Sequence, residues 1–133
     1  MQQIASAKSS FLLDEPLEVL HSESMEWLEE LELLKDESVF LHALIIGKAK
    51  QNLSVFKAKE SKDIEKHLIY VSAEKLDDLK IEVLTHERFL ARLMDNMNLD
   101  EQLYRRRHKA ITEKIHACEK EFKGIFSQLK NLL

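Results

Sequence analysis

The feature that most constrains the fold is the spacing of the apolar residues, which recur every three and then four positions over most of the chain. This spacing places them on one face of an α-helix. Gly and Pro together number only three, at Pro16, Gly47 and Gly124. A sheet protein needs turn residues about every 8–12 positions. The sequence therefore predicts an all-α protein built from long helices.

Three helices are expected, at about residues 15–57, 63–96 and 99–132, with a polar link at Lys57–Lys62 between the first two. The core positions expected for the first helix are Leu17, Leu20, Ser24, Trp27, Leu31, Leu34, Ser38, Leu41 and Ile45. Those for the second are Ile69, Ser72, Leu76, Leu79, Val83, His86, Leu90, Leu93 and Met97, without a slip. Those for the third are Tyr104, His108, Ile111, Ile115, Cys118, Phe122, Ile125, Leu129 and Leu132.

The short links force neighbouring helices to run antiparallel. We therefore expect residues 14–133 to form one domain, an antiparallel up-down-up bundle of three long helices, after a flexible leader at residues 1–13. The apolar face of the first helix is widened by Leu28, Val39 and Leu44. A second copy docked on that face would make a larger bundle through dimerisation.

Charge is unevenly distributed along the chain. Residues 1–47 hold ten acidic and two basic residues, whereas residues 48–133 hold 14 acidic and 18 basic ones. Opposite charges beside a helix seam help to select partner and orientation. The acidic first helix is therefore expected either to pack beside its more basic neighbours or to present an acidic surface to a basic partner.

The cellular setting is bounded by what the sequence lacks. Cys118 is the single cysteine, so neither an intramolecular disulfide nor a cysteine-based zinc site is possible. No apolar run approaches the roughly 18–20 residues that span a membrane, and Phe11–Leu13 is too short for a signal-peptide core. We expect a cytoplasmic protein without a membrane partner.

Two core histidines form the candidate site. If the links are centred near residues 61 and 97, His86 lies opposite His108 and Ser38, in one layer of the bundle. Glu37 and Glu82 are expected beside that layer. Imidazoles and carboxylates projecting inward from different helices are the ligands of bundle metal sites, which suit iron, manganese or zinc. The candidate ligands are His86, His108, Glu37 and Glu82.

A buried polar layer without metal explains the same residues. A polar residue at a core position often fixes the register of helices at some cost in stability. The di-metal bundle pattern also requires Glu-x-x-His pairs that face the core. The one such pair, Glu113 and His116, is expected to point outward. We therefore favour the structural layer over the metal site.

No motif argues for an enzyme. The sequence has no Gly-rich phosphate loop and no nucleophile elbow, and Cys118 occupies a core position. The basic run of Arg105–Arg107 with Lys109 offers a weak anion site, but it covers no single helix face and no nucleic-acid motif accompanies it. The favoured function is non-catalytic association through helix faces, with itself as a homo-oligomer or with a protein partner; metal binding is the alternative.

Overall fold

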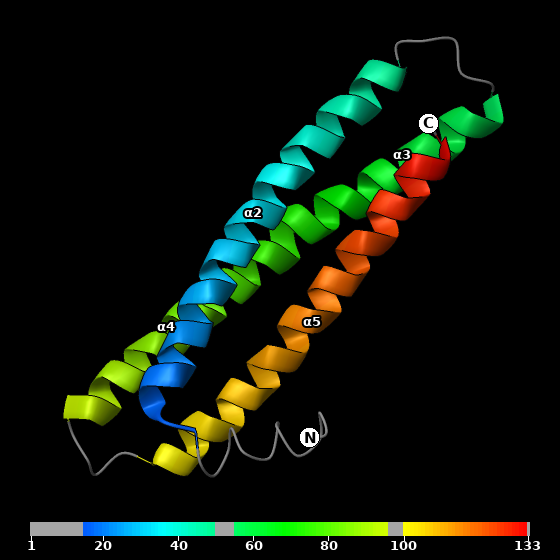
Figure 1. The fold of residues 1–133 in the computed structure, drawn as a ribbon. Coiled ribbons are helices and arrows are strands. Elements are labelled where there is room, and N and C mark those ends of the chain that lie inside the picture. Colours follow the sequence, from blue (N-terminus) through cyan, green and yellow to red (C-terminus); the bar gives the residue numbers. More distant parts are fainter. Residues whose placement is uncertain (1–14, 50–54, 96–99, 133) are drawn as a thin grey trace.

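The computed structural model describes residues 15–49, 55–95 and 100–132 (Figure 1). These residues are almost entirely helical and contain no strand. The elements in chain order are α2 (Leu17–Ala49), α3 (Val55–Tyr70), the π-helix η1 (Val71–Lys75), α4 (Leu76–Asp95) and α5 (Glu101–Leu132). The all-α prediction is confirmed for the described part of the chain.

Three long helical arms lie side by side in Figure 1. The first arm is α2, the second is the continuous run of α3, η1 and α4, and the third is α5. The second arm returns along the first, and α5 then runs back toward the end where α2 finishes. Both α2 and α5 pack against the second arm along its length, whereas they touch each other least.

The core follows the predicted seams in the first and third arms. All nine expected positions of α5 are buried. In α2 the expected positions are buried except Leu17 and Leu34, which are half-buried. Local apolar spacing was therefore enough to identify the buried face of both helices, because each keeps an unbroken α-helical repeat.

The predicted seam of the second arm is wrong in its first half. Ile69 is exposed, while Leu68 and Val71 are buried. Between Val71 and Leu76, which are both buried, the step is five residues instead of four. The five-residue π-turn η1 accounts for this step, because the Leu76 N–H bonds to the Val71 carbonyl. One extra residue in the turn shifts the buried face by one position.

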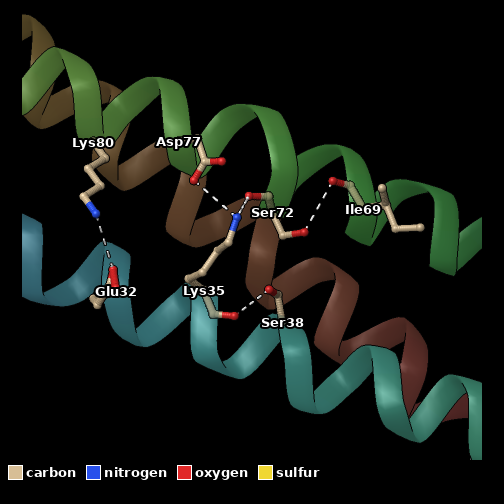
Figure 2. A network of polar contacts seen from close by, with 7 residues as sticks. All are labelled: Glu32, Lys35, Ser38, Ile69, Ser72, Asp77 and Lys80. Carbon is tan, nitrogen blue, oxygen red and sulfur yellow. Dashed lines mark hydrogen bonds and ion pairs between the residues drawn. The ribbon is translucent and has the colours of Figure 1, made fainter.

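Lys35 of α2 supports this π-turn (Figure 2). In a regular α-helix the Leu76 N–H would bond to the Ser72 carbonyl. The Lys35 Nζ instead donates to the Ser72 carbonyl oxygen at 2.8 Å and to Asp77 Oδ1 at 3.2 Å. An ammonium from the neighbouring arm thus satisfies a backbone acceptor that the π-turn leaves without its α-helical donor.

The link between the first two arms also differs from the prediction. We expected it at Lys57–Lys62, but α2 ends at Ala49 and α3 begins at Val55, so α3 runs through the expected link. In this stretch Lys59, Glu60 and Lys62 are exposed, whereas Ser61 is buried. This displacement changes which residues of α2 lie level with the histidines.

Some expectations fall outside the described residues. The leader at residues 1–13 and the end of the second seam at Met97 belong to this group. Among the described helices, none is both long enough and apolar enough to traverse a lipid bilayer.

Truncation of a buried apolar residue and of an exposed one should change the free energy of unfolding by different amounts. Replacing the buried Leu68 by alanine should lower the free energy of unfolding by about 2–5 kcal/mol, because it leaves a cavity. The same truncation at exposed Ile81 should change it by less than about 0.5 kcal/mol. Urea unfolding followed by circular dichroism measures both. Equal losses at the two positions would contradict this assignment of the core.

Candidate functional site

His86 of α4 and His108 of α5 meet in the core, as the sequence predicts. His86 Nε2 lies 3.0 Å from His108 Nδ1, and both residues are buried, with exposed fractions of 3% and 1%. The other ring nitrogen of His108, Nε2, lies 2.7 Å from Glu23 Oε1 of α2. A carboxylate and two imidazoles therefore form one hydrogen-bonded chain that crosses all three arms.

Aromatic rings enclose this chain. His86 stacks on Tyr104 with ring centroids 4.2 Å apart and planes within 1° of parallel. The centroids of Trp27 and His108 are 4.5 Å apart. Phe89 meets Tyr104 edge to face at 6.0 Å. These rings keep water from the imidazoles and fix their orientation.

The histidine layer divides the apolar core. Toward one end of the molecule, Leu20, Leu90, Leu93 and Tyr104 form a small buried cluster. The larger cluster fills the rest of the core, and Trp27 belongs to it. A polar layer between two apolar clusters is the arrangement by which helices fix their register.

Burial controls the protonation of the two imidazoles. Burial first, and then the positive charges of His108 and Arg107, lower the pKa of His86 from 6.5 to about 3. Burial likewise lowers the pKa of His108 to about 4, although Glu87 opposes the shift. Burial and the neighbouring Glu15 and Glu26 raise the pKa of Glu23. Both histidines are neutral at pH 7.

Neutrality fixes the tautomers of the chain. An ionised Glu23 accepts the Nε2–H of His108, whose Nδ1 must then accept the Nε2–H of His86. His86 Nδ1 is left with a bare lone pair. That atom, together with Ser24 Oγ and the Tyr104 hydroxyl, is buried without a hydrogen-bond partner among the described residues.

The acidic residues predicted for this layer lie elsewhere. Glu82 accepts hydrogen bonds from the Lys114 ammonium at 3.0 Å, near the surface. Glu37 is exposed, in a groove beside Phe122. Ser38 is buried away from the histidines and donates to the Lys35 carbonyl. The misplaced link is the reason: because α2 ends at Ala49 and α3 begins at Val55, the α2 residues level with His86 lie about four turns earlier than expected.

The residues that sequence reasoning missed at this level are Glu23 and Tyr104. Tyr104 was expected in the core, but not stacked on His86. Glu23 precedes the core residue Ser24, and Trp27 follows one turn later. A polar core position flanked by a carboxylate was the available signal, but it occurs equally at Glu37 and Ser38. Only the position of the link distinguishes the two.

The surroundings of His86 and His108 offer few side chains that could bind a metal. Among the described residues, no three or more His, Cys, Asp or Glu side chains come close enough together to hold a metal ion. What the arrangement does provide is a row of polarised hydrogen bonds in a dry environment, ending on the unprotonated Nδ1 of His86.

The arginines and the cysteine that the sequence analysis considered make structural contacts. Arg105 is buried and donates to Glu101 Oε2 and to the Glu15 carbonyl. Arg107 lies 5.1 Å above the Phe89 ring. Cys118 is buried, and burial raises the pKa of its thiol, which keeps it in its unreactive protonated form.

Comparison with known proteins gives no family assignment. No protein-family model, no curated protein and no solved structure matches the chain. The function is therefore argued from the residues themselves.

The buried histidines predict acid sensitivity. Between pH 6.5 and about pH 4 the unfolded chain binds protons on His86 and His108 that the folded chain does not. Each such proton lowers the free energy of unfolding by about 1.4 kcal/mol per pH unit as the pH falls. Glu23 offsets part of this loss, because its raised pKa lets the folded state bind a proton first. The urea midpoint should therefore fall from pH 7 to pH 5.

The control separates these two histidines from the exposed ones. The double variant His86→Gln/His108→Gln should be less stable at pH 7 and should lose most of the pH dependence. The variant His21→Gln/His42→Gln alters partly exposed residues that pair with Glu87 and Glu65, and should retain it. A urea midpoint of the native chain that does not change between pH 7 and pH 5 would contradict the prediction.

Proposed function

We propose that this protein is a non-catalytic helical protein that acts by self-association, and that a second copy of the chain covers the outer surface of α2. The observation that carries the proposal is where the exposed large apolar side chains lie. Six of the twelve in the described residues belong to α2, whereas α5, of nearly equal length, contributes one. The six are Val19, Met25, Leu33, Val39, Phe40 and Ile46.

Their distribution around the helix supports association. In α4 and α5 the apolar residues concentrate on the face toward the core, as expected for a helix at the surface. In α2 they occur on the core face and on both flanks. Exposed apolar patches rimmed by polar residues commonly mark interaction sites. The outer surface of α2 therefore fits an interface better than permanent contact with water.

A second copy is the occupant that the charges favour. The eight acidic and two basic residues of α2 are complementary to the four acidic and eight basic residues of α5. The chain thus has both members of a complementary pair. On this proposal the three arms form an up-down-up bundle that dimerises into a larger one, in the cytoplasm, where Cys118 stays a free thiol.

Self-association should depend on α2 specifically. Sedimentation velocity from about 1 to 100 µM should show a monomer–dimer equilibrium. Replacing Leu33 and Phe40, which are 64% and 58% exposed, by serine should weaken the dimer about tenfold or more, since apolar contact area is lost. The matched control is Ile81→Ser/Met94→Ser on α4, at positions 62% and 57% exposed. A native chain that stays monomeric, or equal effects of both variants, would refute the proposal.

Metal binding at the histidine layer is the second candidate. The carboxylate of Glu23 on His108 Nε2 resembles the outer carboxylate that orients a metal-ligating histidine. His108 Nδ1 and His86 Nε2 would then be the ligand atoms, with iron, manganese or zinc as the ion. A metal would have to replace the hydrogen bond between them, and Glu37 and Glu82 lie outside this arrangement.

Elemental analysis of untagged protein tests this candidate. Stoichiometric iron, manganese or zinc that is lost in His86→Ala and retained in Arg106→Ala would establish it. Less than about a tenth of an equivalent, with no uptake from added metal, would reject it and leave the layer structural.

A further inference from the structure

We infer that two copies meet at the groove between α2 and α5, with α2 of each copy lying against α5 of the other about a two-fold axis. The inference rests on the proposed self-association and goes further by naming both surfaces of the interface. A two-fold axis requires the same patch on both copies, so that patch must be complementary to itself. The α2–α5 side of the molecule has this property.

A groove marks this side of the molecule. It has a volume of about 270 Å³. Its lining comes from both helices: Leu33, Leu34 and Glu37 of α2, with Phe122, Lys123 and Phe126 of α5. It opens here because α2 and α5 touch each other least among the long helices. Leu33 and Phe126 are exposed in it, so the groove presents apolar surface between an acidic and a basic side chain.

The α2 flank of the groove contains a second heptad pattern beside the core seam. Its members recur at intervals of four and three and are Glu26, Glu30, Leu33, Glu37, Phe40 and Leu44. Residues at this spacing share one helix face. This face combines carboxylates with exposed apolar side chains, which is the composition of a helix edge that pairs with a basic helix.

The α5 flank has the opposite charge. Basic and imidazole side chains recur along it at heptad intervals, at Lys109, His116, Lys120, Lys123 and Lys130. Lys123 reaches the groove, and Lys120 and His116 are exposed. Placing α2 of one copy on α5 of the other therefore joins an acidic face to a basic one at two equivalent contacts. Placing α2 on α2 would instead oppose two acidic faces.

Two carboxyl groups meet in the same seam. Burial first, and then a hydrogen bond with Glu30 of α2 and the charge of Glu30, raise the pKa of Glu119 of α5. Lysines of a second copy placed at this seam would favour the ionised form of both carboxyls.

The available area is sufficient for a stable dimer. Helices of 33 and 32 residues are each about 50 Å long, and two of them side by side cover a face on the order of 1,000 Å². A standard interface buries about 800 Å² per partner.

Charge reversal and mixing tests this arrangement. The acid-reversed variant is Glu26→Lys/Glu37→Lys, and the base-reversed variant is Lys120→Glu/Lys123→Glu; all four positions are exposed. Each variant alone opposes like charges at both contacts, and its dimer should weaken about tenfold or more at low salt. An equimolar mixture should recover near-native affinity as a heterodimer, because both contacts are again complementary. The readout is sedimentation equilibrium, with one variant fluorescently labelled.

The control and the contrary outcomes are distinct. Arg88→Glu/Arg92→Glu makes the same charge change on exposed positions of α4 and should leave the dimer unchanged. Circular dichroism confirms that each variant keeps its helix content. Native dimers that the base-reversed variant does not weaken, or a mixture that does not recover, would overturn this arrangement while leaving self-association intact. A native chain that remains monomeric would overturn the proposed function itself.

Discussion

The hydrogen-bonded chain from Glu23 through His108 to His86 sets the relative heights of the three arms. The Nε2–H of the buried His108 has an acceptor only because a carboxylate from α2 lies at the same level. A shift of one helical turn would leave His108 Nε2–H unpaired inside an aromatic enclosure, at a cost of about 1–3 kcal/mol. The apolar seams on either side would tolerate such a shift much better, since leucine and isoleucine occur at every level. The polar layer therefore supplies the specificity that the apolar layers lack.

The π-turn at Val71–Lys75 determines which residues of the second arm face the core. Leu68 and Val71 on one side of it and Val83 and His86 on the other all face the core. Without the extra residue, a continuous α-helix would rotate one of these stretches about 100° away from the core. The turn leaves the Ser72 carbonyl without its usual donor, and Lys35 provides one. The same lysine contacts Asp77, so the second arm is joined to α2 at the point where its own hydrogen bonding is irregular.

The unequal number of exposed apolar residues on α2, α4 and α5 links the fold to the proposed association. Among the described residues, α2 has six exposed large apolar side chains, whereas α4 has three and α5 has one. The cost of exposing Leu33 and Phe40 to water is removed if a second copy covers them. The separation of charge between α2 and α5 then determines which helices meet. A single helix thus contributes both to the core and to the proposed interface, which explains why its apolar pattern is broad.

The sequence alone determined the helical class, the buried faces of α2 and α5, and the meeting of His86 with His108. These follow from local periodicity and from a short link near residue 97, both of which are encoded over a few turns of chain. It did not determine that Glu23, rather than Glu37 or Glu82, reaches the histidines, nor that the seam of the second arm slips by one residue. Those features depend on where the first link falls and on a single five-residue turn. The polar stretch of α3 resembles a link, and the π-turn has no distinctive composition, so only the packing of the arms against one another decided both.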